Sequence, residues 1–447
     1  MPNDVAALVA AVRARDVDAA QKLLIAGAEP NARDGDGDGW TVLGLAAAQA
    51  DTEMCHLLVS SGARLDLRCP GGRTPVMVAA DGGALGAWWA LCAGSPDLSL
   101  RDDLGRDAGD LARAWLGVDP AAELLRRLGA ADGESAEITR EAAPDEGVGH
   151  FETVRVTTPL GTASVQTGHA AILSELEEKQ GIRVPYAELA DRALALGPDH
   201  ACHFLVAITL TNRMDDETLA LAAGELEASP DPARRRFAAE VLLLYGMPVL
   251  PDKEGETAER LDAAATEVLC RRVGVEEDPR VLAEIVNGVG LHYAVRALPD
   301  LVRHAGHPDR DVRLRVAGAL HGLAEPDDTE ALGALTALTQ DMDREVREVA
   351  ARSLSDVQAD TPAIRASLAR LMADSDPDVA VEGARGLGLR DDPRADIPLV
   401  RSFLGRDEDS SPECHRAYDA IRRMPVERFR AARAVVEGRD PDAGQQG

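Results

Sequence analysis

The 447-residue chain has few aromatic side chains and an excess of negative charge. Phe, Trp and Tyr make up 3% of it, whereas hydrophobic residues as a whole make up 45%. A core with so few aromatic rings must be built mainly from Ala, Leu and Val, which suit closely packed helices. The composition therefore predicts an all-α fold, and the length predicts several domains or a repeat array.

The chain has 48 basic residues (Lys and Arg) and 77 acidic residues (Asp and Glu), so its formal net charge is −29. A field of this sign repels phosphate backbones and anionic membrane surfaces, so nucleic acid is a poor partner and a basic protein is a better one. Few aromatic rings are available to stack single-stranded bases. No apolar run reaches the length of a membrane helix, and we expect no membrane partner.

Closely spaced cysteines are also missing. The six cysteines form no CxxC pair and no dense disulfide framework, which indicates reduced thiols in a cytosolic protein. They are Cys55, Cys69, Cys92, Cys202, Cys270 and Cys414. The N-terminal stretch MPNDVAALVAAVRARD has no cationic region before its apolar residues, so it does not match a signal peptide. These features predict a cytoplasmic location.

The first third of the chain repeats with a fixed period. Gly-Trp-Thr, Gly-Arg-Thr and Gly-Arg-Asp end at Thr41, Thr74 and Asp107, a spacing of 33, and each opens a helix-length apolar segment. A second apolar segment follows and stops at a glycine, which tolerates the left-handed conformation of a helix end. Clusters of Asp, Asn, Gly and Pro fill the gaps, as turns require. Residues 1–130 are predicted to form about four units of turn, helix and helix.

This pattern resembles the ankyrin repeat, most clearly in GRTPVMVAA at 72–80 and LLIAGAEPNA at 23–32. Gly44 stands where the family's Thr-Pro-Leu-His motif has histidine. The first and last units depart furthest from the pattern, as capping repeats do. In this family partners bind the projecting turns and the inner helix face. The resemblance therefore implies a partner surface made of Asp36, Asp38, Trp40, Arg73 and Arg106. The alternative is that these are only solvated turn residues.

Two adjacent tryptophans, Trp88 and Trp89, lie on a predicted helix. Neighbouring helical residues point about 100° apart, so both rings cannot enter the same seam. An exposed ring here would be a hot-spot candidate for partner binding. The alternative is that both rings are partly buried between repeats, as large aromatic side chains usually are.

Residues 131–165 are rich in Gly, Glu, Asp, Ala and Pro and are predicted to be an acidic linker. Within it, FETVRV at 151–156 alternates apolar and polar side chains, as a strand does. The stretch PLGT at 159–162 supplies a turn, so the sequence favours a short strand pair. No other segment offers a sheet for this pair to join.

A second array is predicted over 166–436, as a helical lead-in followed by about six two-helix repeats. Its clearest copies carry Val312, Val346 and Val379, which are 34 and 33 residues apart. A small residue follows each valine five positions later and a leucine eight positions later, which gives one buried stripe on a helix. An Asp ahead of each valine caps the helix start. Residues 437–447 are predicted to be a disordered tail.

The second pattern resembles the HEAT-like repeats of bacterial proteins, the group that includes bilin-lyase-type repeats, on HPDRDVR at 307–313 and its two successors. In that family Asp and Arg positions link adjacent repeats. The resemblance gives this role to Arg313 and Arg347, and Ala380 breaks the ladder in the next unit. A lyase activity does not follow from it, because repeat architecture serves many functions.

Familiar catalytic and cofactor motifs are missing: there is no phosphate-binding loop, GxSxG, HExxH or Gly-rich dinucleotide turn. We therefore predict no catalytic residue, no cofactor and no metal. The densest candidate cluster is His200, Cys202 and His203, in which the two histidines are neighbours on a helix and would need a third ligand from elsewhere. Helix capping by Asp199 and half-buried histidines explain this cluster more simply.

Together these features predict a non-catalytic protein–protein interaction scaffold or adaptor that uses the ankyrin-like turns and the concave face of the HEAT-like array. An inhibitor or immunity protein fits equally well. The alternative class is a HEAT-scaffold enzyme, or a lyase- or glycosylase-like protein that handles nucleic acid or bases. That alternative needs a positive groove, for which the strong basic clusters are 234–236 and 271–272.

Overall fold

The structure is a computed structural model that describes residues 2–34, 39–130, 136–143, 150–247, 255–404 and 412–439. Within these ranges it contains 24 α-helices and one three-stranded sheet, so the predicted all-α solenoid fold is confirmed. The chain divides into two compact units, residues 1–213 and residues 214–447, and each is described by itself.

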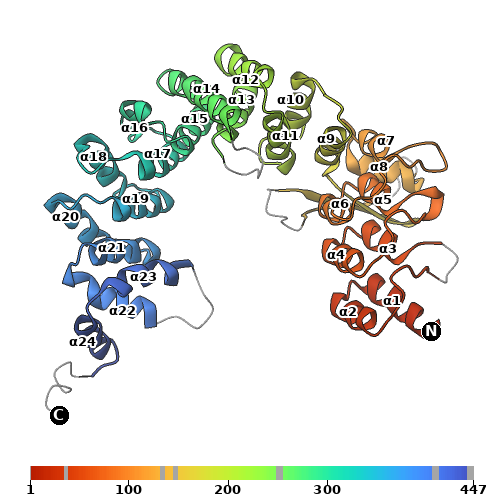
Figure 1. Cartoon of the computed structure of the whole chain (residues 1–447), viewed down its shortest axis with the longest axis horizontal. Coiled ribbons are helices and arrows are strands. Elements are labelled where there is room, and N and C mark those ends of the chain that lie inside the picture. Colours follow the sequence, from red (N-terminus) through yellow and green to blue (C-terminus); the bar gives the residue numbers. More distant parts are fainter. Residues whose placement is uncertain are drawn as a thin grey trace. The chain divides into compact units, whose positions relative to one another are not determined.

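The first unit begins with four helix pairs, in which the first helices stack on one another, as do the second helices of the first three pairs (Figure 1). Asp or Thr caps most of these helices, and Asp107 with Asp110 forms a capping box. The pairs are α1 (Pro2–Ala14) with α2 (Val17–Ile25), α3 (Val42–Ala48) with α4 (Thr52–Ser60), α5 (Pro75–Asp81) with α6 (Leu85–Cys92), and α7 (Ala108–Arg113) with α8 (Pro120–Leu128).

The connections between successive pairs project as three fingers, formed by the segments between α2 and α3, α4 and α5, and α6 and α7. An arginine ladder ties them together through backbone carbonyls. Arg33 Nη1 donates to the carbonyls of Gly39, in its own finger, and of Arg68, 3.0 Å away in the next finger. Arg68 Nη1 repeats this with Gly72 and Arg101, at 2.6 and 2.8 Å. Each finger is therefore fixed in register with the next one.

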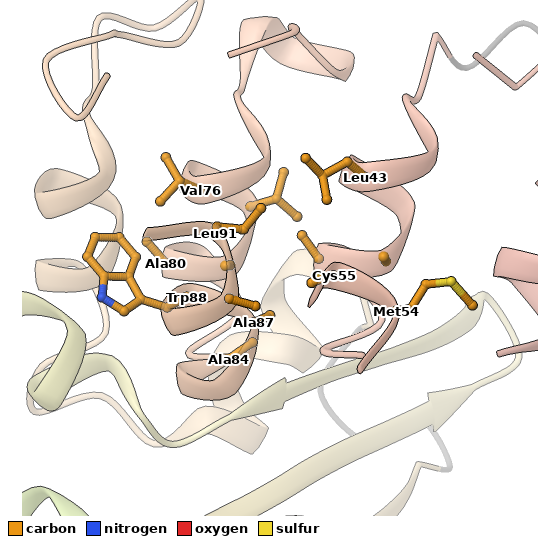
Figure 2. Packing of buried hydrophobic residues seen from close by; sticks show 14 of the residues in the cluster. Leu43, Met54, Cys55, Val76, Ala80, Ala84, Ala87, Trp88 and Leu91 are labelled. Carbon is orange, nitrogen blue, oxygen red and sulfur yellow. The ribbon is translucent and has the colours of Figure 1, made fainter. Parts of the chain in front are cut away.

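Small and aliphatic side chains fill the space between these repeats. Leu43, Met54, Val76 and Leu91 are at most 1% exposed, and alanines such as Ala80 let the helices approach closely (Figure 2). At about 25 cal/mol per Å² of buried apolar surface, such stacking supplies most of the stability of a repeat array.

A three-stranded antiparallel sheet follows the fourth helix pair, in the order β1 (Glu137–Ala142), β2 (Glu152–Thr158), β3 (Gly161–Gln166). The expected strand pair is confirmed as β2 and β3, which turn between Thr158 and Gly161. The described part of 131–165 also contains β1, a third strand that the sequence did not reveal. Val154, Val156 and Val165 from the sheet pack against Leu124 of α8.

The lead-in helices belong to the first unit. They are α9 (His169–Lys179), α10 (Tyr186–Ala195) and α11 (Ala201–Asn212). Helix α9 packs on α5, α6 and α7, and Leu173 and Leu176 join the same core as the repeats. Gly83 makes this possible: its φ is +58°, and a Cβ there would lie 2.1 Å from the Gln166 carbonyl and 2.6 Å from the His169 ring. The boundary between the units therefore falls at Arg213 instead of in the predicted linker.

The second unit contains six helix pairs and a last helix. The second helices of the pairs stack in one row, α13 to α23, and each packs on its own first helix (Figure 1). The pairs are α12 (Asp216–Ala228) with α13 (Pro232–Leu244), α14 (Glu256–Val273) with α15 (Pro279–Leu291), α16 (Leu298–His304) with α17 (Arg310–Leu323), α18 (Thr329–Leu338) with α19 (Arg344–Asp356), α20 (Pro362–Leu371) with α21 (Pro377–Leu389), and α22 (Asp396–Leu404) with α23 (Pro412–Arg423). The last helix is α24 (Val426–Val436), and residues 440–447 of the predicted tail lie outside the described residues.

Arginine side chains link neighbouring repeats of this unit, as the HEAT resemblance implies. Arg313 donates from Nε and Nη2 to both oxygens of Asp341, at 2.6 and 2.9 Å. Arg347 does the same with Asp374, at 2.9 and 3.2 Å. Burial raises the pKa of Asp341, but the hydrogen bonds from Arg313 outweigh it and hold the pKa below its usual range. Arg235 and Glu276 form an earlier rung, at 3.2 and 2.9 Å.

Replacing Arg347 with Ala should loosen the contact between α19 and α21, because it removes a bidentate ion pair and two bonds to the carbonyls of Asp341 and Met342. We expect a local loss of about 1–3 kcal/mol, reduced from the fully buried case because the pair is partly solvated. Hydrogen exchange of α19 and α21 amides in the full chain measures it. The control is Arg344→Ala, whose guanidinium pairs with Asp376 and Asp378 in water and should matter much less. If both variants change the hydrogen exchange of α19 and α21 equally, the Arg347–Asp374 pair is not the main link between these repeats.

Candidate binding surfaces

Three of the predicted partner-binding residues occupy equivalent positions at the bases of the fingers. Trp40, Arg73 and Arg106 each stand one residue ahead of the first helix's cap, and all three are half-buried. Asp36 and Asp38 lie outside the described residues. The Trp40 ring packs against the core of the repeats, and its side chain remains partly accessible.

Asp102 brings the two arginines together. Arg106 donates from Nε and Nη2 to Asp102 Oδ2 at 3.0 and 2.8 Å, and Arg73 Nε lies 3.7 Å from the same oxygen. The Asp102 side chain is 1% exposed. Burial raises its pKa, but hydrogen bonds from the Arg106 side chain and from backbone amides outweigh this and lower it. The carboxylate therefore stays charged and fixes both guanidinium groups.

The same carboxylate shapes the tip of the third finger. Asp102 Oδ1 accepts hydrogen bonds from the amides of Leu104 and Arg106, both at 2.9 Å. Leu104 is thereby held with 76% of its surface exposed. The sequence does not mark Leu104 or Asp102 as part of a binding surface. An apolar residue in a turn indicates a partner contact only when the turn is known to project, and an Asp in a turn is common. We call Trp40, Arg73, Leu104 and Arg106 the finger surface.

Trp88 is not available to a partner, which corrects its assignment as a hot-spot candidate. Its side chain is 0% exposed, between α6 and α9. Its Nε1 and that of Trp89 both donate to Glu175 Oε2 on α9, at 3.2 and 2.9 Å. Trp89 is half-buried. Both indole N–H groups converge on one carboxylate oxygen of α9, so the pair anchors α9 to the repeats.

Asp81, at the end of α5, organises the junction between the fourth repeat and α9. It accepts hydrogen bonds from Trp115 Nε1 at 3.0 Å, from Arg127 Nη1 at 3.0 Å and from Arg73 Nη1 at 2.8 Å. Burial raises its pKa, but these donors outweigh it and lower the pKa. His169 stacks on Trp115, with 4.8 Å between ring centroids, and donates from Nε2 to the Asp81 carbonyl at 3.2 Å.

His200, Cys202 and His203 serve as structural residues of α11. His200 Nδ1 accepts a hydrogen bond from the Cys202 amide at 3.1 Å, so the helix cap is His200 and not Asp199. Its Nε2 lies 2.8 Å from Thr167 Oγ1. Burial lowers the pKa of His200 to about 4 and raises the pKa of the Cys202 thiol to about 12. Across the ranges that the structure describes, no group of three His, Cys, Asp or Glu is placed to hold a metal ion.

The basic clusters of the second unit are engaged with acids. Arg235 and Arg272 both bind Glu276, whose side chain is 2% exposed. The other three pair elsewhere: Arg234 with Glu225, Arg236 with Glu284 and Arg271 with Glu227, at 2.8, 3.0 and 2.8 Å. They come from α13 and from α14, which belong to different rows of helices. The five arginines thus do not form the single positive groove that the enzyme or nucleic-acid alternative requires.

The row of second helices carries its own charge network. Glu382 on α21 is buried, with Arg385 Nη1 at 3.3 Å and Arg352 Nε of α19 at 3.8 Å. Asp356 of α19 pairs with Arg385 and lies 3.8 Å from His321 on α17. Acidic and basic side chains of three successive helices thus contact one another around a buried glutamate.

These features define a helical-repeat protein with two arrays, each made of stacked helix pairs. Its arrays are ankyrin repeats in the first unit and HEAT repeats in the second. The family model for ankyrin repeats matches residues 8–102 in three copies, and the model for HEAT repeats matches residues 266–355 and 333–421. Repeats of both kinds are typical of protein-interaction scaffolds and imply protein partners.

Other comparisons are less informative. No curated protein matches the chain. One similar solved structure is the X-ray structure of YibA from Escherichia coli, which is 18% identical in sequence. The match covers 56% of this chain and 96% of the YibA chain, with a TM-score of 0.40. At that TM-score the likeness supports no conclusion about function. Among the described helices, none is long and apolar enough to cross a membrane.

Acidification should destabilise the first unit through His169. Burial lowers its pKa to about 4, whereas an unfolded histidine titrates near 6.5, so only the unfolded state binds the proton between these values. The stability due to neutral His169 is present above about pH 6.5 and is lost as the pH falls toward about 4, with about 2 kcal/mol lost between pH 7.5 and pH 5.

Tryptophan fluorescence during urea unfolding of the full chain measures this, because all four tryptophans lie in the first unit. His169→Gln should reduce the pH dependence and leave the part due to His200, whose pKa burial also lowers to about 4. His56→Gln, at an exposed position on α4, should retain the full pH dependence. A pH profile that is the same in His169→Gln and in the wild type would refute the assignment.

Proposed function

We propose that the protein is a non-catalytic scaffold that binds a protein partner through its ankyrin fingers. The observation that supports this most is the finger surface, where buried Asp102 fixes Arg73 and Arg106 and presents Leu104 at 76% exposure. Trp and Arg are the residues most enriched at interface hot spots, and a pre-organised surface loses little entropy on binding.

The sheet leaves this surface uncovered within the first unit. The Gln166 amide donates to the carbonyl of Gly82 at 2.9 Å, and the Gly168 amide donates to that of Gly83 at 3.1 Å. Both glycines lie in the turn between α5 and α6, at the opposite end of α5 from the fingers. The fingers and the sheet therefore occupy different ends of the repeat, and a partner can reach the fingers without displacing the sheet.

The net charge of −29 favours a partner that is basic where it approaches the protein. The arginines of the finger surface add little net charge, because Asp81 and Asp102 neutralise them. Their contribution to binding is the fixed orientation of their N–H groups. The paired arginines of α13 and α14 support the same proposal over a nucleic-acid function, since a phosphate backbone would have to compete with a carboxylate at each one.

Leu104→Asp should weaken partner binding by about tenfold or more without unfolding the repeat, because the side chain is exposed and its amide keeps the bond to Asp102. Proteins retained by the immobilised full chain from a lysate of the source organism, identified by mass spectrometry, would supply the partner for titration. The matched control is Leu160→Asp, which changes a 60% exposed leucine in the β2–β3 turn and should leave binding unchanged.

Failure of the wild-type chain to retain any protein would sink the scaffold proposal. If the partner binds Leu104→Asp and the wild type with equal affinity, the finger surface is not the binding site. Tight association with generic DNA or RNA at moderate salt would instead favour the nucleic-acid alternative.

A further inference from the structure

A cavity of about 630 Å³ opens in the first unit beside the last ankyrin repeat. Its walls come from the turn between α7 and α8, from the start of α9 and from one side of α10. The volume lies within the range of about 300–1,000 Å³ that is usual for small-molecule sites. None of the finger-surface residues lines it, so it is separate from the proposed protein-binding surface.

The inner end of the cavity is rigid. Trp115 and His169 line it, and both side chains are about 5% exposed. Their rings stack with an interplanar angle of 18°, and both are bonded to Asp81, one to its carboxylate and one to its carbonyl. Because these bonds lock both rings, this part of the cavity is already shaped before any ligand arrives.

The rest of the lining combines an apolar wall with an acidic rim. Val118 and Leu196 both line the cavity and are 40% and 43% exposed, so they offer apolar surface that a ligand can cover. The charged lining residues are three carboxylates, Asp119, Glu188 and Asp191, against one guanidinium, Arg192. The lining therefore has a formal charge of −2.

Arg192 has little capacity to bind an anion. Its Nη1 donates to Glu177 Oε2 and its Nη2 to Glu188 Oε1, both at 2.5 Å, and its side chain is 7% exposed. Burial keeps His169 neutral, with a pKa of about 4, and the Arg127 guanidinium over the Trp115 ring is already paired with Asp81 and Glu123. An anionic ligand would meet carboxylates at the rim and no available cation within the described lining, whereas a cation would be attracted.

We propose that this cavity binds a small organic cation, an ammonium or guanidinium group carried on an apolar body. The apolar body would occupy the wall between Val118 and Leu196, and the cationic group would lie at the rim near Glu188 and Asp191. This places the charge where carboxylates can accept its hydrogen bonds and the apolar part where water is displaced from apolar surface. The proposal is independent of the protein-binding function.

The test uses the full-length chain and two probes, phenethylamine and 3-phenylpropionate, which share a phenethyl body and carry polar groups of opposite charge; binding is observed by ligand NMR. We expect the amine to bind with a dissociation constant of about 0.1–10 mM, as its size allows. The carboxylate should bind at least about tenfold more weakly. Asp191→Asn should weaken the amine severalfold and leave the carboxylate unaffected or improved.

A blocking variant locates the site. Ala195 lines the cavity from an exposed position on α10, so Ala195→Trp should fill it and reduce amine binding by about tenfold or more. Ala187→Trp places the same ring at another exposed position of α10 that does not line the cavity and should change nothing. Since both positions are exposed, neither variant threatens the fold.

Three results would overturn the proposal: equal binding of the two probes, amine binding that survives Ala195→Trp, or no amine binding at millimolar concentration. Binding of a basic aromatic peptide in the absence of amine binding would assign the cavity to a protein partner and would also overturn it. None of these results depends on whether the fingers bind a protein, so failure here is distinguishable from failure of the scaffold function.

Discussion

Every helix pair in this protein depends on its neighbour to bury its apolar stripe. A pair with alanines and leucines on one face cannot form a closed core alone, so stability comes from stacking. The few aromatic side chains follow from this requirement, since helices that approach through alanine leave no room for rings. Three of the exceptions, Trp88, Trp89 and Trp115, lie where the ankyrin stack ends and pack between the last repeats and α9.

Charge is used in this chain mainly to align repeats. The arginine ladder of the fingers runs through carbonyls, whereas the ladder of the second unit runs through carboxylates. In both cases a planar guanidinium reaches two groups at once, which fixes orientation as well as distance. The consequence for binding is that most arginines near the candidate surfaces are already paired. What a partner meets is an acidic protein whose positive groups are held in place by carboxylates.

The end of the ankyrin array is held by contacts that do not recur from repeat to repeat. There Asp81 collects bonds from Arg73, Trp115 and Arg127, and its carbonyl binds His169. These contacts do two things at once: they close the repeat stack against the sheet and α9, and they hold the inner end of a cavity in a fixed shape. A terminal repeat has to bury its last face on something other than another repeat, and here that junction lines the cavity proposed to bind a small cation.

The sequence alone determined the two arrays, because a helix pair repeats its caps, glycine stops and apolar stripe at each unit, and periodicity of this kind depends only on local geometry. The resemblance to HEAT repeats implied the linking roles of Arg313 and Arg347, and the structure shows them. The third strand, the burial of Trp88, the exposure of Leu104 and the cluster around Asp81 were decided by tertiary structure. Each joins residues that occur once and lie far apart in the chain, such as Trp115 and His169 or Trp88 and Glu175, so no spacing could reveal them. Local periodicity predicts how a repeat is built, but not what covers its last face.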